Sequence, residues 1–199
     1  MPMLDIYVPE GALQPEAEAA LLDRLTDILI KYEGFDPADP TTRAVFWAFL
    51  HRPVVVHVGG VPADAPRYKV VATVPEGQLD RSAREAVVAE VTEAVLDAEQ
   101  GAWPRDVRRV WVFPTEVPDG YWGGRGRITP LSDILQRLTR GDLDQARELA
   151  ARRITGSRIE RAHIPAAPAP PDPSSDATVA EVRRLLWSSR SHWPGPRPS

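Results

Sequence analysis

A proline directly after the initiator methionine is the residue in this chain whose chemistry could extend furthest beyond packing. If Met1 is removed, which the small second residue permits, Pro2 becomes a free secondary amine at the start of a predicted strand. An α-amino group has a pKa of about 7.7 to 8.0 in water, and burial among apolar groups or a nearby arginine lowers it. Such an amine is largely neutral near pH 7, which a general base that acts on carbon acids requires.

Six further side chains are candidates for binding a substrate. In chain order they are Arg109, Phe113, Tyr121, Trp122, Arg125 and Arg127. The last two arginines lie in a glycine-rich run, 123–127 (GGRGR), and a guanidinium can bind a carboxylate through two parallel hydrogen bonds. The tyrosine and tryptophan just before this run are expected to wall a pocket, with the tyrosine hydroxyl available to stabilise a developing enolate.

Composition excludes several kinds of site and partner. The 199-residue chain has no cysteine, so it has no disulfide, thiolate nucleophile or thiolate zinc site. His51 and His57 are six residues apart without clustered carboxylates, a spacing with no metal signature, and we expect no metal ion. The acidic first half and the net charge of −4 argue against a nucleic-acid partner. No apolar run is long enough to cross a membrane and the start lacks a signal peptide, so we expect a cytoplasmic protein.

An internal repeat predicts the elements that position these residues. A shift of 66 residues lays 8–11 (VPEG) onto 74–77 (VPEG), and the flanking apolar residues keep their phase. Before each motif, apolar residues alternate as in a half-buried strand: Leu4, Ile6 and Val8, and then Val70, Ala72 and Val74. After each motif they form a helical stripe: Ala17, Ala20, Leu21, Leu25, Ile28 and Leu29, and then Ala83, Ala86, Val87, Val91, Ala94 and Val95.

Local signals support both helices and a second strand in each unit. Pro15 suits the first turn of one helix, and Asp80 can cap the other. Aromatic and β-branched residues at 44–49 and 110–113 predict the second strands. The fold class is therefore α+β: two tandem β-α-β units form a four-stranded mixed sheet with two helices on one face. Four aromatic residues leave the other face apolar, and we expect an oligomer to bury it. These are Phe46, Trp47, Trp111 and Phe113.

A proline-rich segment at 165–173 predicts an extended spacer, and we place the domain boundary just before it. The expected parts are a domain at 1–163, with unit one at 2–62, unit two at 67–128 and added helices at 129–163, and a tail at 164–199. Its apolar residues predict a short amphipathic helix within the tail. We expect this segment to be a disordered or loosely docked end, or to dock on a neighbouring subunit or a partner protein.

Taken together, these features resemble the tautomerase superfamily. The likeness is carried by the start of the chain, 1–11, by 58–61 (VGGV), by 110–118 (VWVFPTEVP) and by 121–124 (YWGG). The fused double-unit branch that includes the cis-3-chloroacrylic acid dehalogenases has the same layout. The resemblance implies a tautomerase/MIF-like fold, a homotrimer, and an amino-terminal proline that acts as general base or acid on a small oxo or unsaturated acid.

The chain departs from that branch at several functional positions. Pro75 and Gln78 stand where the branch has two arginines, Leu29 where it has a histidine, Phe113 where it has a tyrosine, and Tyr121 near its water-activating glutamate. Because the chain lacks these functional groups of the branch, we do not expect a hydrolytic dehalogenase.

One activity is expected, with two alternatives. We expect a cofactor-independent isomerase in which Pro2 moves a proton in the keto–enol tautomerisation or isomerisation of a small or aromatic oxo or unsaturated acid. One alternative is a cyclase or isomerase of specialised metabolism that uses the same base on a larger, less acidic molecule. The other is a non-catalytic trimeric scaffold that binds a partner through its tail helix.

Overall fold

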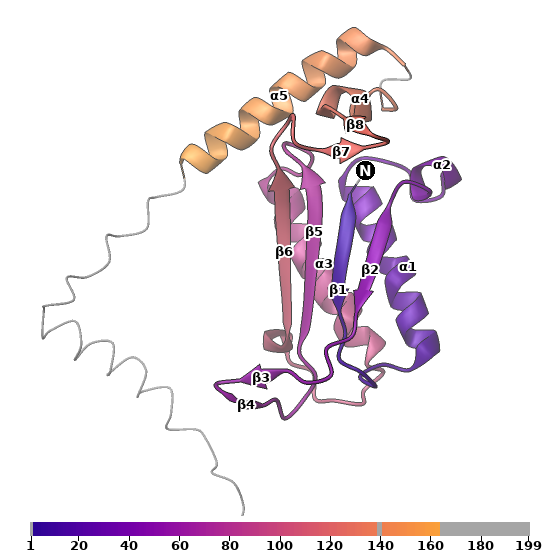
Figure 1. Ribbon diagram of the computed structural model, residues 1–199, viewed down its shortest axis with the longest axis vertical. Coiled ribbons are helices and arrows are strands. Elements are labelled where there is room, and N and C mark those ends of the chain that lie inside the picture. Colours follow the sequence, from indigo (N-terminus) through magenta and orange to yellow (C-terminus); the bar gives the residue numbers. More distant parts are fainter. Residues whose placement is uncertain (1, 139–140, 164–199) are drawn as a thin grey trace, which may run out of the picture. The chain divides into compact units, whose positions relative to one another are not determined.

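The computed structural model describes residues 2–138 and 141–163, and a four-stranded mixed sheet with two helices on one face dominates them (Figure 1). The elements of the two repeat units are β1 (Met3–Tyr7), α1 (Pro15–Tyr32) and β2 (Trp47–His51), followed by β5 (Tyr68–Pro75), α3 (Arg81–Ala98) and β6 (Val110–Val117). The predicted α+β class and the tandem β-α-β layout are confirmed.

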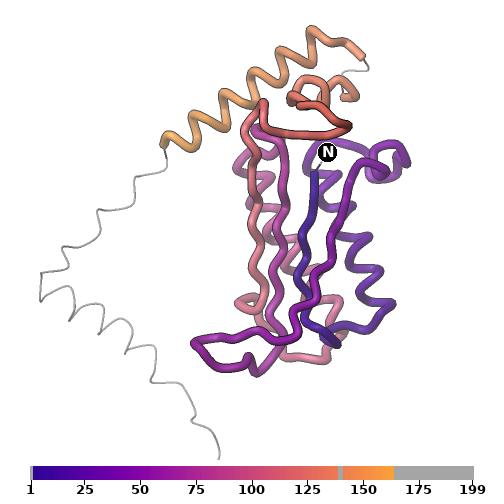
Figure 2. Tube along the Cα trace, viewed as in Figure 1, coloured from indigo at the N-terminus to yellow at the C-terminus, as the bar shows by residue number. Residues whose placement is uncertain are grey.

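The two units are joined through an antiparallel central pair of strands. The strand order is β2-β1-β5-β6, and each outer strand runs parallel to the first strand of its own unit. Met3 lies opposite Thr73, and Tyr7 lies opposite Lys69. The start of β1 therefore lies beside the end of β5, whereas the start of β5 lies at the far end of the sheet. Figure 2 shows α1 and α3 together behind the strands, and the two helices contact each other.

The core lies between the sheet and these two helices. The predicted alternation in β1 and β5 is confirmed, because all six apolar residues of the two VPEG-flanking strands are buried. Each fully buried aliphatic side chain of this kind stabilises the fold by about 1.5–3 kcal/mol. Most of the predicted helical stripes are also buried or half-buried, but Ala20 is exposed. It lies about 100° around α1 from Leu21, at the solvent side of the buried arc.

Local capping explains where the two long helices begin. Pro15 occupies the first turn of α1, and acidic Glu16 and Glu18 lie in the same turn. Their negative charges interact favourably with the positive end of the helix dipole. The Asp80 carboxylate accepts a hydrogen bond from the backbone N–H of Ala83, 2.8 Å away, at the start of α3. Both capping predictions are confirmed.

The sheet face opposite the helices carries two matching aromatic pairs. Trp47 and Phe49 on β2 pack edge to face with ring centroids 6.4 Å apart, and Trp111 and Phe113 on β6 do so at 6.3 Å. All four are exposed, with 64% of Trp47 and 66% of Trp111 accessible. The structural repeat thus continues into the second strands, but with a shift of 64 rather than 66 residues.

The structure corrects where the second strand of the first unit begins and which of its aromatic residues lies on the apolar face of the sheet. The strand predicted at 44–49 begins only at Trp47, because Asp39 caps a short helix, α2 (Pro40–Arg43), through the backbone N–H groups of Thr41 and Thr42. Phe46, predicted for the apolar face, instead packs half-buried against the core, and Phe49 takes its place on that face.

Short elements connect and extend the two units. They are β3 (His57–Val58), β4 (Val61–Pro62), the 3-10 turn η1 (Val107–Arg109), β7 (Gly123–Gly124), β8 (Arg127–Ile128), α4 (Leu131–Leu135) and α5 (Leu143–Ala162). Helices α4 and α5 lie within 129–163, where added helices are expected. The proline-rich spacer and the tail helix lie outside the described residues. Among those described, no helix is long and apolar enough to cross a membrane.

Ion pairs hold α5 against the turn that follows β5. Glu76 is buried and binds Arg158 at 3.0 Å and also Arg161, while Ser157 donates to Glu116 at 2.7 Å. Hydrogen bonds from Arg158 are the largest cause that lowers the pKa of Glu76, to about 2. The carboxylate is therefore ionised at neutral pH and fixes the helix electrostatically.

Candidate active site

A cavity of about 620 Å³ opens at the end of the sheet where β1 begins. Its lining residues come from both units and from the segment after β6: Pro2, Met3, Ala44, Val45, Trp47, Thr73, Val117, Tyr121, Trp122, Gly123, Gly124 and Arg125. Four of the seven candidate residues therefore meet in one place. Most of the lining is apolar, as is typical of sites that bind small organic molecules.

The sheet register places the proline at the cavity. Pro2 is buried and immediately precedes β1, whose first residue, Met3, pairs with Trp47 on one side and Thr73 on the other. Because β1 is a central strand with the core on its far side, the position of Pro2 is set by two neighbouring strands rather than by a loose terminus. The nitrogen of residue 2 is thus held at a defined point of the cavity wall.

The other candidates arrive on a loop that is tied down at both ends. The backbone N–H of Asp119 donates to buried Glu76 at 3.0 Å, and the Asp119 carboxylate accepts from the N–H of Leu131 at 2.9 Å. Within the loop, the Trp122 carbonyl accepts from the N–H of Thr129 at 2.8 Å, which closes the β7–β8 hairpin. Figure 1 shows this hairpin next to the amino-terminal end of β1.

The two arginines of the hairpin have different surroundings. Arg125 sits at the hairpin turn with a φ of 55° and lines the cavity that contains Pro2. Arg127 does not line that cavity; its guanidinium lies 3.6 Å from the Asp133 carboxylate. Arg125 is thus the one cationic side chain among the described residues that line the cavity.

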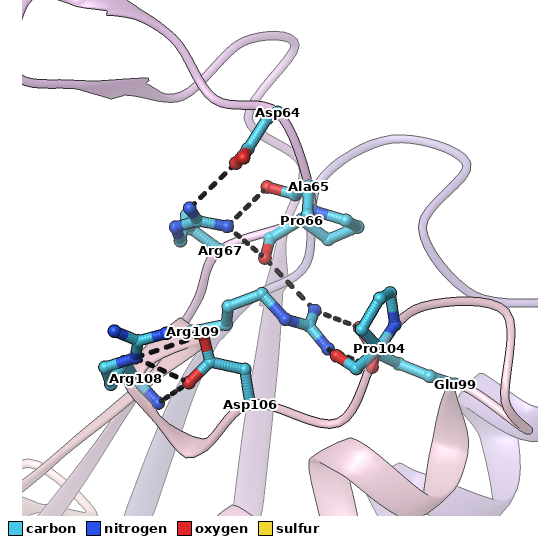
Figure 3. Close-up of polar contacts among 9 residues, drawn as sticks. All are labelled: Asp64, Ala65, Pro66, Arg67, Glu99, Pro104, Asp106, Arg108 and Arg109. Atoms are coloured by element: carbon cyan, nitrogen blue, oxygen red, sulfur yellow. Dashed lines mark hydrogen bonds and ion pairs between the residues drawn. The ribbon is translucent and has the colours of Figure 1, made fainter. Parts of the chain in front are cut away.

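The remaining two candidates lie elsewhere. Phe113 is on the exposed aromatic face and does not line the cavity. Arg109, expected to bind substrate, is buried near the start of β5, and both of its terminal nitrogens bind the Glu99 carboxylate (Figure 3). It also donates to the backbone carbonyls of Pro66 and Pro104. Its two terminal nitrogens are bonded within the protein, and the structure does not bring Arg109 to the Pro2 cavity.

The region around Arg109 is the second unit's counterpart of the Pro2 cavity. A shift of 66 residues places Tyr68 at the position of Pro2, and Tyr68 is buried with its hydroxyl 2.8 Å from Glu99. Burial is the largest cause that raises the pKa of Tyr68, and the Glu99 carboxylate adds to it. The second unit therefore has an uncharged phenol bound to the Glu99–Arg109 ion pair where the first unit has Pro2. The two ends of the sheet differ chemically.

Sequence reasoning missed one titratable residue at the Pro2 end. Glu33 directly follows α1 and is completely buried, and burial raises its pKa to about 7. The positive charge of the amino terminus, the Gln78 side chain and Arg153 oppose this rise. The same 66-residue shift aligns Glu33 with Glu99. This identity between the two units was the sequence signal that could have indicated Glu33.

The described residues contain no group of three or more histidine, aspartate or glutamate side chains arranged to hold a metal ion. The expected independence from cofactors stays a prediction.

Comparisons with known proteins bear on the fold. No protein-family model and no curated protein matches the chain. Among solved structures, the R7 fused 4-OT wild-type asymmetric trimer matches 63% of this chain and 94% of its own, with 21% identity and a TM-score of 0.53. Pt0534 inactivated by 2-oxo-3-pentynoate matches 64% and 94%, with 22% identity and a TM-score of 0.52.

A third match is N1, a member of the cis-3-chloroacrylic acid dehalogenase family, which covers 75% of this chain and 99% of its own with 17% identity and a TM-score of 0.54. All of these structures are from the tautomerase superfamily. At this level of identity, the matches establish that the chain has the tautomerase fold, and the expected resemblance is confirmed at that level.

Proposed function

We propose that the chain is a tautomerase-superfamily enzyme whose Pro2 amine serves as general base and acid in the keto–enol tautomerisation or isomerisation of a small or aromatic oxo or unsaturated acid. The observation that carries the proposal is the cavity in which Pro2 meets Tyr121, Trp122 and Arg125. The fold shared with enzymes of that superfamily adds support.

The proposal requires that Met1 be removed. A proline nitrogen within a peptide bond has no N–H and no basic lone pair, whereas a terminal proline is a secondary amine. Its site is buried and shares a cavity with Arg125, and both conditions lower the pKa of an amine. A neutral amine near pH 7 is then available to accept a proton.

The proposed reaction is a proton transfer between two positions of the substrate. The Pro2 nitrogen removes a proton from the carbon next to a carbonyl group. The electron pair of that C–H bond forms a carbon–carbon double bond, and the π pair of the carbonyl group moves onto its oxygen. Tyr121 donates a hydrogen bond to the resulting enolate oxygen, and Arg125 pairs with the carboxylate. Pro2 then returns the proton at a different atom, so atoms and charge balance without a metal or organic cofactor.

The assembly proposed for this enzyme is a cytoplasmic homotrimer that acts on a small molecule, without a nucleic-acid or membrane partner. Four large aromatic side chains are exposed together on one face of the sheet, and an apolar patch of this kind is typical of a protein–protein interface. Three of the matched fused 4-OT structures are described as trimers. The tail helix is a proposed docking element for a neighbouring subunit.

The lining of the cavity favours a second candidate with the same base. Trp47, Val45 and Trp122 make the walls apolar, and one described lining residue is cationic. A cyclase or isomerase of specialised metabolism, with a larger and less acidic substrate, fits such walls. A non-catalytic scaffold would instead show no turnover at all.

Turnover by wild type and Pro2→Ala separates these candidates. Phenylenolpyruvate and 2-hydroxymuconate are followed by ultraviolet absorbance after intact mass has shown that Met1 is absent. A primary amine replaces the secondary amine in the variant, so we expect a loss of about 100-fold in kcat. Equal rates would exclude Pro2 as the base, and turnover of neither compound by wild type would favour the second candidate or the scaffold.

A further inference from the structure

We propose that Glu33 is a positioning residue for Pro2, and that its carboxylate holds the proton on the Pro2 amine between the two halves of the reaction. This inference rests on the proposed function of Pro2. Glu33 lies beyond the residues that line the cavity, so it acts through the amine and not on the substrate.

The topology brings Glu33 to the end of the sheet where β1 begins. Because β1 and β2 are parallel, α1 must run back along them, and its last turn returns to the starting end of both strands. Glu33 continues the helix by donating its backbone N–H to the Leu29 carbonyl at 3.0 Å. Its side chain is completely buried there.

The second unit shows the geometry that this arrangement creates. Tyr68 and Glu99, the counterparts of Pro2 and Glu33, are joined by a hydrogen bond of 2.8 Å through the phenol hydroxyl. A tyrosine side chain fills the gap between strand start and helix end in that unit. In the first unit a proline ring is shorter, but a terminal amine has two N–H donors of its own when protonated.

Polar and charged groups from several elements lie near Glu33 or share the cavity with Pro2. Gln78, which follows β5, donates its side-chain N–H to the Glu33 backbone carbonyl at 3.3 Å, and Arg153 of α5 interacts with the Glu33 charge. On the cavity side, Arg125 and Tyr121 are the described charged or titratable residues that share the lining with Pro2. The two arginines favour an ionised carboxylate and disfavour a protonated amine.

The pairing has a direct chemical consequence. An ionised carboxylate beside the amine favours its protonated form, so the proton taken from substrate is held until it is returned. Burial raises the pKa of Glu33 to about 7, and the carboxyl group and the amine therefore titrate in overlapping ranges as a coupled pair. Without the negative charge, the amine releases its proton more readily and its pKa falls.

The test is a pH titration of the Pro2 nitrogen in the mature full-length protein labelled with ¹⁵N-proline, observed by NMR. A terminal amine resonates apart from the amide nitrogens of the other prolines. Glu33→Gln should lower the pKa of the amine by about one unit or more, as expected for loss of an opposite charge within hydrogen-bonding range. Glu33→Asp retains the charge and should restore most of the shift.

A matched control and a second readout make the test specific. Glu99→Gln removes the equivalent buried carboxylate from the second unit and should leave the Pro2 titration unchanged. In Glu33→Gln, the acid limb of the kcat/KM profile should move to lower pH by the same amount. If the Pro2 pKa is unchanged in a folded Glu33→Gln protein and turnover still depends on Pro2, the role of Glu33 is wrong and the proposed function stands. If turnover does not depend on Pro2, the proposed function itself is wrong.

Discussion

Arg125 and Arg127 are two residues apart and have the same side chain, yet the structure gives them different partners. Arg125 lines the Pro2 cavity, whereas Arg127 faces Asp133. The sequence indicated both arginines equally, because a glycine-rich run does not define which way each side chain points. It also indicated Arg109, which is instead bound by Glu99. That contact depends on how α3 packs against β6, which local residue patterns do not encode.

Arg125→Ala should raise KM for an oxo acid by about 10- to 100-fold, because a charge-assisted hydrogen bond contributes about 1.5–3 kcal/mol. Arg127→Ala is the matched control and should change KM by less than about twofold. Steady-state kinetics with phenylenolpyruvate measures both. A larger KM effect from Arg127→Ala would contradict the assignment of Arg125 as the carboxylate-binding residue.

At the scale of elements, regular local patterns were enough to predict the main sheet and its two long helices. Alternation in β1 and β5 and the caps at Pro15 and Asp80 are short-range features, and each lies where it was expected. The two-residue strands of the hairpins are too short to have a period. The attachment of α5 depends on ion pairs whose partners are separated by 82 and 85 positions in the sequence. No local pattern reports contacts between residues so far apart.

Gly77→Ala should detach or shift α5. A Cβ at Gly77 would lie 2.8 Å from the backbone carbon of Arg153, so the helix must move. Gly11, its counterpart in the first unit, has a similar positive φ, but a Cβ added there would meet no atom within 4 Å. Gly11→Ala therefore controls for backbone strain alone. Denaturant unfolding should show Gly77→Ala to be less stable than Gly11→Ala by about 1–3 kcal/mol, and equal stabilities would contradict the close contact.

Acid should weaken the attachment of α5 through Glu76. The pKa of this carboxyl is lowered to about 2 in the folded chain, so the stability it contributes is present above its ordinary pKa of 4.5 and is lost as the pH falls toward 2. We expect a loss of ~2 kcal/mol, reduced from the full linkage value because both arginine partners are largely exposed. Unfolding free energies of wild type and Glu76→Gln, measured from pH 6 to pH 2, should converge. Parallel curves would contradict the role of this ion pair.

At the scale of the whole molecule, the exposed aromatic face should form the trimer interface. Trp111→Glu places a charge on this face, and burial of an unpaired charge opposes assembly. Val54→Glu is the control, because Val54 is a more exposed apolar residue outside the four-stranded sheet. Light scattering should give three times the 22.0 kDa chain mass for wild type and Val54→Glu, and one chain mass for Trp111→Glu. A monomeric wild type would contradict the trimer.

The central claim is that the chain uses a free Pro2 amine in its cavity, and intact mass spectrometry before and after reaction with 2-oxo-3-pentynoate tests it most directly. An alkynyl ketone accepts a neutral amine at its triple bond. We expect a starting mass without Met1, one adduct per chain located on Pro2 by fragmentation, and loss of turnover in proportion to labelling. Retention of Met1, or full turnover with the adduct on another residue, would contradict it.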